Sequence, residues 1–508
     1  MELLLICLFL ASLLFFLTIQ KPRKHGALPG PSGLPFIGNL HQLDASNLHR
    51  HLWQLSKDYG PIFSLKLGFR SVLVVSSAEM AKEILKTNDV LFSDRPPFIS
   101  HQIMSRNGLD LSFANYGEYW REMRKICAIH LFSSKRVHSF SHIRNGEIAR
   151  MIKNLSQFAS DAKLANMSEI LFSHTSSVIC RIAFSRRYDE EGSARSKFHS
   201  LLNEVQAVVG SFYYSDYFPY MGWLDKLTGR ISRIHKTFKE LDLFLQERID
   251  EHLDNNKRVH NGSDKEDITD VLLQMRGNDS FKVDLTVNHI KAVIMDIFVA
   301  GTDTSAATLV WGMTELMRNP RVMKKLQEEV RGLNDGEKAV INDGDLQNLP
   351  YLKAVVKETL RLHPPAPLMV PHYTYQKCNV GGYEIKPDTM VHVNVWAVGR
   401  DPKHWEKPEE FWPERFLGNP IDFRGQDFEF IPFGAGRRSC PGINLGALTV
   451  ELALANLAYS FDWKLPEGMK EEDIDMDVRP GIAMHKKNEL CLLPKNYSGV
   501  KRLVNVEG

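Results

Sequence analysis

The segment FIPFGAGRRSCPGINLG, Phe430 to Gly446, constrains the fold of this chain more than any other. It places Cys440 among glycines and close behind two arginines. A cysteine thiolate that binds haem iron donates electron density to the metal, which favours cleavage of the O–O bond. Gly436 and Gly442 permit backbone conformations that turn amide groups toward the sulfur. The segment therefore predicts a loop that holds Cys440 as the axial ligand of a haem iron.

Two neighbours of Cys440 fit the same prediction. The ring of Phe433 can cover the thiolate and exclude water, and the guanidinium of Arg438 can pair with a haem propionate. The chain has 6 cysteines, and the others share no spacing, no C-x-x-C pair and no histidine at zinc-ligand distance. We expect those to be ordinary thiols. Cys440 is the predicted metal ligand, and haem b (iron protoporphyrin IX) is the cofactor that the family resemblance described below implies.

A second candidate site lies inside a predicted hydrophobic helix, MDIFVAGTDTSAATLVWGM, Met295 to Met313. Polar residues and a glycine interrupt it from Gly301 to Ser305, and such a local break is where a functional site is expected. Gly301 leaves room for a groove or for a local helix distortion. The alternative for Thr304 is a bond from its hydroxyl to a backbone carbonyl one turn earlier. At helical spacing one face carries Ile297, Ala300, Gly301, Thr304 and Thr308.

Two further pairs of residues stand at helical spacing. Glu358 and Arg361 lie one turn apart in KETLRLHPP, before a proline stop. Trp120 and Arg124 lie four residues apart in YWREMRK and can donate together to one haem propionate. The alternative for the second pair is a basic surface patch with a packed tryptophan.

Together these motifs resemble the cytochrome P-450 superfamily. PFGAGRRSCPG, Pro432 to Gly442, matches its signature F-x-x-G-x-R-x-C-x-G. Ala300 to Ser305 resembles its distal-helix motif A/G-G-x-D/E-T-T/S in every slot. By this resemblance Thr304 would hold a water next to the iron, and Asp303 would link that water to a proton source as a general acid.

The resemblance also implies roles at the edge of the haem site. FWPERF resembles the family's partner segment, so Arg415 would join Glu358 and Arg361 in a buried ion network that keeps the cysteine loop in shape. One position departs from the family, because MVPHYT places His372 where an arginine usually meets a propionate. A neutral histidine donates one hydrogen bond without fixed charge, so haem affinity or potential would differ slightly.

The resemblance covers nearly the whole chain and implies a mainly α fold with a minor β region, the prism-shaped cytochrome P-450 fold. Alternating hydrophobicity predicts a strand hairpin over Pro61–Ser77 and a second pair of strands within Cys378–Val398. Strands on both sides of a long helical middle indicate one mixed domain. Helical periodicity predicts helices over 141–181, 231–256, 285–317, 320–332, 351–363 and 442–460.

The N-terminus differs from the rest of the chain. Leu3 to Ile19 carries no charge and precedes the basic run KPRK, which by the positive-inside tendency leaves the body in the cytosol. As a helix it would be about 25 Å long, slightly short of a hydrocarbon core of about 30 Å. The alternative, a cleaved secretory signal, lacks its basic start and small-x-small cleavage site. We expect a membrane anchor over 1–20, a basic and proline-rich hinge over 21–40, and a haem-binding catalytic domain over 41–508.

Charge and resemblance together set the expected partners. With 63 basic and 61 acidic side chains the net charge is +2, so no global field favours nucleic acid. The resemblance implies a single-pass protein of the endoplasmic reticulum membrane with its catalytic domain on the cytosolic side. It implies electrons from NADPH through a flavoprotein reductase partner. An acidic reductase would meet positive charge from Arg121, Lys125, Lys135, Arg136 and Arg437.

The implied reaction is a haem-thiolate monooxygenation, which inserts one oxygen atom from O₂ into a small hydrophobic substrate. The motif style is nearest the plant-type microsomal branch that acts on aldoximes, phenylpropanoids and terpenoids. Two other functions stay open: a reductase-independent haem-thiolate isomerase or dehydratase, and a non-catalytic haem-binding membrane protein. The pair Asp303 and Thr304 argues against both. Position alone suggests an apolar substrate pocket formed by Ile297, Ala300, Leu368, Val370 and Ile482.

Overall fold

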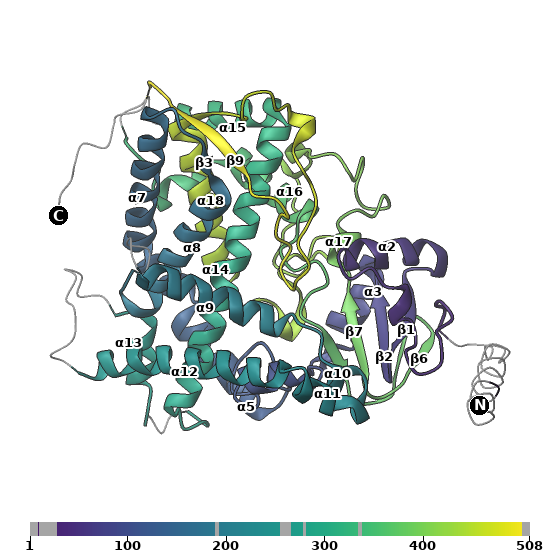
Figure 1. Ribbon diagram of the computed structural model, residues 1–508. Helices are drawn as coiled ribbons and strands as arrows, with labels where there is room; N and C mark the ends of the chain where they lie inside the picture. The colour runs from purple at the N-terminus through teal and green to yellow at the C-terminus, as the bar shows by residue number, and fades with distance from the viewer. Residues whose placement is uncertain are drawn as a thin grey trace.

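The computed structural model describes residues 9, 28–187, 193–254, 266–277, 281–333 and 338–499. The predicted anchor, apart from Phe9, lies outside the described residues. The described part consists mainly of helices with a smaller region of strands, as the sequence predicts, and Figure 1 shows the two parts side by side. The longer helices are α2 (Leu48–Tyr59), α5 (Glu118–Ile126), α7 (Ser141–Ser160), α8 (Met167–Phe184), α9 (Ser193–Val209), α12 (Arg230–Leu253), α14 (Val287–Arg318), α15 (Pro320–Gly332), α16 (Pro350–Leu362) and α18 (Ile443–Ser460).

Helix α14 runs through the centre of the helical part (Figure 1). Thr286 caps its N-terminus in a reciprocal pair with His289, and Pro320 begins α15 directly after it. It packs against α8, α16 and α18, so almost every side chain along it is buried. Among the described helices it is the one long and apolar enough to cross a membrane, but 72% of its apolar window is buried inside the protein, as expected of a core helix.

The shorter helices connect these long ones. They are α3 (Ala78–Lys82), α4 (Ile99–Met104), α6 (Ser134–Ser139), α10 (Tyr214–Tyr217), α11 (Gly222–Leu227), α13 (Ile268–Gln274) and α17 (Val395–Val398). The predicted helix over 141–181 is in fact two helices, α7 and α8. The short strand β3 (Ala165–Asn166) separates them, because it pairs with β9 and because the Asn166 side chain caps α8 by accepting from the Glu169 N–H at 3.2 Å.

The main sheet has the strand order β1-β2-β7-β4. The predicted hairpin is present: β1 (Ile62–Leu67) and β2 (Arg70–Val75) are antiparallel and turn at Gly68. This glycine has φ +58°, and a Cβ there would lie 2.5 Å from the Tyr217 carbonyl oxygen, so no other residue fits the turn. The other two strands are β7 (Thr389–Val393), parallel to β2, and β4 (His372–Thr374), antiparallel to β7.

The second predicted strand pair differs from the structure. β5 (Cys378–Val380) and β6 (Tyr383–Ile385) pair with each other, whereas β7 leaves them and joins the first hairpin. β2 and β7 are both mostly buried, so each needs a hydrogen-bonding partner inside the protein, and they pair with each other. β5 and β6 form a separate hairpin. A third sheet joins β3, β9 (Cys491–Asn496) and β8 (Phe461–Lys464) beside α7.

Part of the predicted hinge lies against the body of the protein. The Ser64 N–H donates to the Pro29 carbonyl at 2.8 Å, and the Gly68 N–H donates to the Ile37 carbonyl at 3.1 Å. A Cβ on Gly30 would lie 2.1 Å from the Ser64 carbonyl oxygen, so the segment approaches β1 closely. Residues 28–40 therefore belong structurally with the sheet rather than with a free connector.

Candidate functional site

A cavity of about 280 Å³ lies between α14, the cysteine loop and the start of α18. Its lining brings together residues from distant parts of the chain, including Cys440 of the loop and Thr304 of α14. The sequence-predicted residues that line it are Trp120, Arg124, Ile297, Ala300, Thr304, Val370, His372, Phe433, Arg438 and Cys440.

The cysteine loop owes its shape to a 3₁₀ turn over Gly436–Arg438. Gly436 has φ +67°, and a Cβ there would lie 2.1 Å from the Leu85 carbonyl oxygen, so this position requires glycine. The Cys440 N–H donates to the Phe433 carbonyl at 2.8 Å, which closes the loop. The Gly442 N–H is directed to the sulfur, as predicted, although its φ of −91° is one that other residues also adopt.

Burial and the neighbouring groups have opposite effects on the pKa of the Cys440 thiol. Burial raises the pKa of the thiol, whereas the Gly442 N–H and the positive charge of Arg124 lower it. A cation bound to the sulfur would favour the thiolate further. The side chain is thus a free, half-buried thiol beside a donor and a cation, which fits a ligand of a positively charged iron.

Arg124 and Arg438 lie at the edge of this cavity but are held by the backbone. Arg124 Nη2 donates to the Ser439 carbonyl at 2.6 Å. Arg438 donates to the carbonyls of Ser93 at 2.7 Å and Ala114 at 2.6 Å, and its guanidinium lies 4.2 Å from the centre of the Trp120 ring. Burial lowers the pKa of Arg438 to about 10, so it keeps its charge at neutral pH.

Trp120 differs from the expectation that it shares one propionate with Arg124. Its single donor, the indole N–H, donates to the Leu111 carbonyl at 3.0 Å. The ring instead forms the packed face on which the Arg438 guanidinium lies. The structure therefore gives Trp120 a positioning role at the cavity edge.

His372 lines the cavity as a neutral side chain. Burial lowers its pKa to about 3, and its Nδ1 is 2.8 Å from the Phe92 carbonyl oxygen, to which it donates as a neutral ring. The positive charge that this position lacks is present next to it. Arg95, which the sequence prediction missed, donates from Nη1 to the carbonyls of Val370 at 2.8 Å and Pro371 at 2.9 Å.

Arg95 is 7% exposed and lines the same cavity, so it is a third buried guanidinium beside Arg124 and Arg438. Burial first, and then the charge of Arg438, lowers its pKa. A buried cation of this kind is stabilised by an anion. No motif around SDRPP points to Arg95, because its neighbour in the fold, His372, lies far away in the sequence.

These residues fit haem b. A thiol faces the cavity from the loop, three arginines stand at its edge for the two propionates, and much of the remaining lining is apolar. Cys440 would hold the iron, and Arg95, Arg124 and Arg438 would balance the carboxylates. Bound in this place, the haem supplies an iron that activates O₂.

We expect Arg95→Gln to lower haem retention several-fold, because it removes a cation from the cavity edge and leaves three backbone carbonyls without donors. The ratio of haem absorbance to protein after gel filtration measures this. Arg276→Gln, at an exposed position, is the matched control. Equal haem content in the two variants would contradict the assignment of Arg95.

The distal part of the cavity is formed by α14. The Thr304 hydroxyl donates to the Ala300 carbonyl at 2.7 Å, so the bond given above as the alternative does exist. This bond uses the hydroxyl proton and leaves the oxygen lone pairs free to accept from a ligand in the cavity. No distortion occurs at Gly301, since α14 is continuous; a Cβ there would lie 2.9 Å from the Ile179 side chain, so the glycine lets α8 pack closely.

Asp303 does not line the cavity. Its Oδ1 lies 2.6 Å from Nε2 of His485, whose side chain is 31% exposed. The His485 loop is fixed on α14, because the Trp311 indole donates to the Met484 carbonyl at 2.7 Å. Asp303 is thus joined to the solvent by a histidine that no local pattern in the sequence indicates.

Two predicted pocket residues lie elsewhere. Leu368 packs with the hydrophobic cluster under β1 and β2, and Ile482 is 37% exposed beside Gly210, so neither lines the cavity. The lining also contains a missed acid, Asp296, which accepts from the Leu111 N–H at 2.7 Å. Burial raises its pKa to about 6. The pocket is therefore less uniformly apolar than expected.

Glu358, Arg361 and Arg415 lie together below the cysteine loop. Arg361 donates to both carboxylate oxygens of Glu358 at 2.8 Å, and Arg415 Nε donates to Oε1 at 3.1 Å. Glu358 and Arg361 have fully buried side chains. Arg361 also donates to the carbonyls of Gly399 at 2.5 Å and Pro408 at 2.7 Å, so the network ties α16 to the loop that follows α17.

A chain of aromatic rings connects this network to Cys440. The Arg361 guanidinium lies 5.3 Å from the centre of the Trp405 ring. Trp405 contacts Phe430 at 6.2 Å, Phe430 contacts Phe423 at 6.3 Å, and Phe423 contacts Phe433 at 5.3 Å between ring centres. The Phe433 carbonyl then accepts from Cys440. Packing of this kind transmits the position of the ion network to the ligand loop.

Comparison with known proteins agrees with this site. The family model described as "Cytochrome P450" matches residues 28–493. The chain is 47% identical to 6,7,8-trihydroxycoumarin synthase of Pastinaca sativa (97% of this chain and 98% of the relative) and 44% identical to strychnine-11-hydroxylase of Strychnos nux-vomica (96% and 95%). A zebrafish cytochrome P450 structure with progesterone aligns with a TM-score of 0.74 at 26% identity, covering 88% of this chain and 99% of that one. The chain therefore belongs to the cytochrome P450 family of haem-thiolate monooxygenases.

Proposed function

We propose that this monooxygenase uses electrons from NADPH, delivered by a flavoprotein reductase, to hydroxylate a small planar aromatic molecule of specialised plant metabolism. The observation that carries the proposal is that one cavity contains both the Cys440 thiol and the Thr304 hydroxyl. Two relatives support the substrate class, because their names describe hydroxylated aromatic products: 6,7,8-trihydroxycoumarin synthase and 5-OH-xanthotoxin synthase, both of Pastinaca sativa. A terpenoid substrate is the other outcome that a substrate panel distinguishes.

The shape of the lining supports a flat, mostly apolar substrate. Ile179, Val293, Ile297 and Ala300 contribute apolar surface from α8 and α14. Asp296 and Ser112 add polar groups at one edge, where they can orient a hydroxyl or ether oxygen through a bound water or a direct bond. Such a cavity binds its substrate by shape and excludes water from the reacting carbon.

Protons are proposed to reach the cavity along His485, Asp303 and Thr304. His485 is partly exposed and takes a proton from water, and its Nε2 lies 2.6 Å from the Asp303 carboxylate. Thr304 follows Asp303 on α14, and its oxygen accepts a hydrogen bond from a group in the cavity.

We expect Thr304→Ala to retain the haem spectrum but to release hydrogen peroxide from a larger share of the NADPH consumed, because the acceptor that orders the proton path is lost. A several-fold fall in product formed per NADPH is the expected size. Thr304→Ser, which keeps the hydroxyl, is the matched control and should stay close to the wild type. Unchanged coupling in Thr304→Ala would show that protons arrive by another route.

The reductase is proposed to bind beside the cysteine loop. Arg121 and Lys125 of α5 and Lys135 of α6 are exposed and are the strongest candidates. Arg136 lies 3.6 Å from Glu266, and Arg437 lies 2.9 Å from Asp89, so these two are partly neutralised. Lys125 has a looser contact, 3.9 Å from Glu122, and its side chain stays 63% exposed, so it still presents its charge to an acidic partner.

We expect Lys125→Glu to slow reduction by the reductase several-fold at low salt and to show a much smaller difference at high salt, because screening weakens contacts between exposed charges. Stopped-flow reduction at several ionic strengths measures this. Lys386→Glu, an exposed lysine after β6, is the control with the same charge change. A rate that does not depend on ionic strength in the wild type would remove the electrostatic docking.

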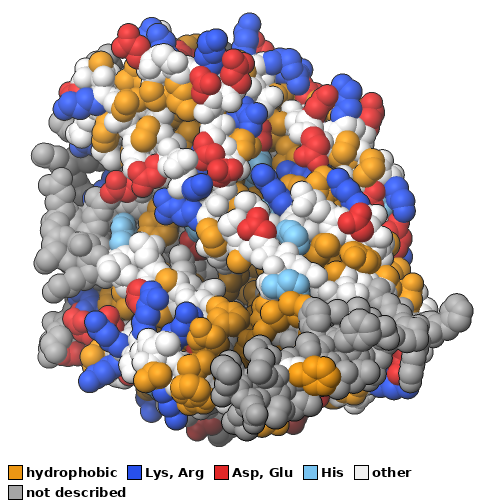
Figure 2. All heavy atoms as spheres, turned by 45° about the vertical axis from the view of Figure 1, so that its right-hand side comes forward, with side chains coloured by type: hydrophobic (Ala, Val, Ile, Leu, Met, Phe, Trp, Pro, Cys, Tyr) orange, Lys and Arg blue, Asp and Glu red, His pale blue; other side chains and the backbone are white. Residues whose placement is uncertain are grey.

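The protein is proposed to sit on the endoplasmic reticulum membrane, anchored through 1–20 and linked by a hinge, with the catalytic domain in the cytosol. One surface supports this. Phe69 at the β1–β2 turn contacts Phe218 and Tyr220 at 6.3 and 6.5 Å between ring centres, and Trp223 and Leu227 of α11 are 59% and 75% exposed. In Figure 2 hydrophobic side chains gather around a hollow in the lower half of the face, whereas charged side chains cover its upper half. A patch of this kind suits a lipid surface.

Reconstitution tests the proposal as a whole. Microsomes carrying the protein receive coumarins, other phenylpropanoids, aldoximes and terpenes, each with and without NADPH and reductase. The proposal requires an oxygenated product that needs both. Product formation without them would favour the isomerase or dehydratase alternative, and no product with any class would favour the non-catalytic haem protein.

A further inference from the structure

A second pocket, of about 1030 Å³, shares no lining residue with the Cys440 cavity. Its walls come from α2, the C-terminal ends of α14 and α16, α17 and the loop 407–412. It is lined by Arg50, Trp53, Glu315, Arg318, Asn319, Arg321, Leu362, His363, Trp396, Arg400, Lys407, Glu409, Glu410, Phe411, Trp412 and Met476.

Most charges in this pocket are neutralised by a partner. Arg321 donates to Glu414 at 2.5 Å, Arg400 Nε donates to Glu409 at 3.1 Å, and Lys407 lies 3.3 Å from Glu410. These three pairs leave no net charge. The charge of a ligand that this pocket can bind therefore depends on its remaining cations.

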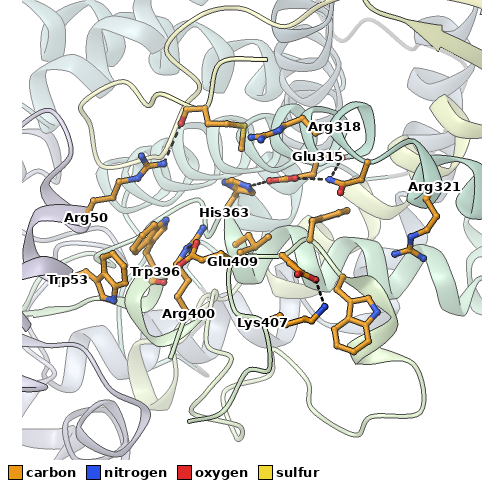
Figure 3. A pocket seen from close by; sticks show the side chains of 16 residues that line it. Arg50, Trp53, Glu315, Arg318, Arg321, His363, Trp396, Arg400, Lys407 and Glu409 are labelled. Atoms are coloured by element: carbon orange, nitrogen blue, oxygen red, sulfur yellow. Dashed lines mark hydrogen bonds and ion pairs between the residues drawn. The ribbon is translucent and has the colours of Figure 1, made fainter. Parts of the chain in front are cut away.

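Arg50 and Arg318 have no carboxylate within ion-pair distance among the described residues. Arg50 Nη2 reaches the Met476 carbonyl only at 3.5 Å, and its Nε–H is buried without an acceptor. An unpaired buried donor on a cation is costly, so it indicates a missing partner. Figure 3 shows Arg50 and Arg318 reaching toward each other from opposite sides, with His363 between them.

One acid, Glu315, lies near these two arginines but is already used. His363 Nε2 is 2.7 Å from Glu315 Oε1, and the Asn319 side chain donates to Oε2 at 3.2 Å. Burial lowers the pKa of His363, so it is neutral and donates to the carboxylate. Counting Arg50, Arg318 and Glu315, the pocket has one positive charge in excess. One additional negative charge would neutralise it.

Aromatic side chains form one end of the same pocket. Trp53 and Trp396 meet edge to face at 5.4 Å between ring centres, and the Arg400 guanidinium lies 3.8 Å from the centre of the Trp396 ring. In Figure 3 the two tryptophans lie together beside Arg50. Flat apolar molecules bind such rings by stacking or edge contacts. The volume exceeds what a small inorganic anion fills, since pockets of roughly 300–1,000 Å³ hold drug-sized organic ligands.

We propose that this pocket binds an aromatic monocarboxylate, with the carboxylate between Arg50 and Arg318 and the ring against Trp53, which the buried Trp396 supports from behind. Guanidinium and carboxylate match in geometry and form charge-assisted bonds. A monoanion neutralises the excess charge, whereas a phosphate dianion overshoots it. The arrangement is independent of the oxygenation reaction, because none of these residues lines the Cys440 cavity.

The test measures binding of trans-cinnamate to the purified haem-loaded protein by titration calorimetry. We expect one saturable site, and binding at least tenfold weaker in Arg50→Gln and in Arg318→Gln. Arg321→Gln is the matched control: it lines the same pocket, and its partner Glu414 keeps Lys325 at 2.7 Å, so binding should be unchanged. Haem content and thermal unfolding verify that each variant is folded.

Two arms use the wild-type protein and do not depend on any variant. Cinnamamide, with the same ring and no charge, should bind at least tenfold more weakly than cinnamate, and inorganic phosphate should compete poorly. Equal binding of the amide, full competition by phosphate, or cinnamate binding that survives both arginine substitutions would each overturn the proposal.

Discussion

Replacing Cys440 by alanine is expected to abolish the thiolate-type absorption band of the reduced, carbon monoxide-bound protein. Among the described cysteines, Cys440 is the one whose side chain lines the cavity. Without the sulfur, the axial ligand and its negative charge are lost together, and O–O cleavage loses the electron donation that drives it. Product formation should fall below detection.

Cys378→Ala is the matched control, since Cys378 is a half-buried free thiol on β5 outside the cavity. It should keep both the band and the activity. Cys440→His offers a second variant that can still bind haem, and its spectrum should change to that of a nitrogen ligand. A thiolate band that persists in Cys440→Ala would mean that another residue holds the iron.

Short-range features of this chain were predictable from the sequence because they are local. The loop around Cys440 is recognisable in the sequence by its glycines. They are required for steric reasons, as at Gly436, where a Cβ would lie 2.1 Å from the Leu85 carbonyl oxygen. The polar segment Gly301–Ser305 of α14 was equally visible, since polar residues stand out in an apolar helix. The hairpin at Gly68 followed from alternation and one glycine.

Features that depend on distant parts of the chain were not predictable. Arg95 and His372 lie side by side through bonds to Val370 and Pro371, and no spacing in the sequence joins them. The pair of Asp303 and His485 depends on how the C-terminal loop lies on α14. The sheet partner of β7 depends on which strand buries it. In each case the tertiary contact, rather than a local pattern, decides the role.

The pocket of about 1030 Å³ shows that even the partner of a charged residue within one helical turn is not predictable from the sequence. Glu315 and Arg318 are spaced like an ordinary surface pair on α14, yet Glu315 turns to His363 at 2.7 Å, and no carboxylate of the described residues lies within ion-pair distance of Arg318. Stacking of Trp311 on His363, at 4.3 Å between ring centres, holds the histidine in place for that bond. Within the described part of the chain, Arg318 thus lacks an ion pair because a tertiary contact, that of Glu315 with His363, takes the carboxylate one turn away.

The ion network should give the second large effect. Glu358→Gln is expected to lower the free energy of unfolding by about 3–5 kcal/mol, because it leaves the fully buried Arg361 without its counter-charge. The amide also cannot accept at both oxygens, so the bonds from Arg415 and the Trp412 N–H weaken at the same time. Haem loss should accompany unfolding, since the rings from Trp405 to Phe433 link this network to the cysteine loop.

The chain contains its own control for the spacing. Glu328 and Arg331 of α15 repeat the E-x-x-R arrangement, but Glu328 is 64% exposed and lies 4.0 Å from Lys324. Because exposed pairs contribute little, Glu328→Gln should change the unfolding free energy by less than about 0.5 kcal/mol. Denaturant unfolding of both variants, followed by far-UV circular dichroism and by haem absorbance, measures the difference. If Glu358→Gln does not fold, Arg415→Lys removes one bond of the network and should give an intermediate loss; equal stability of the Glu358 and Glu328 variants would show that burial of the network does not hold the ligand loop.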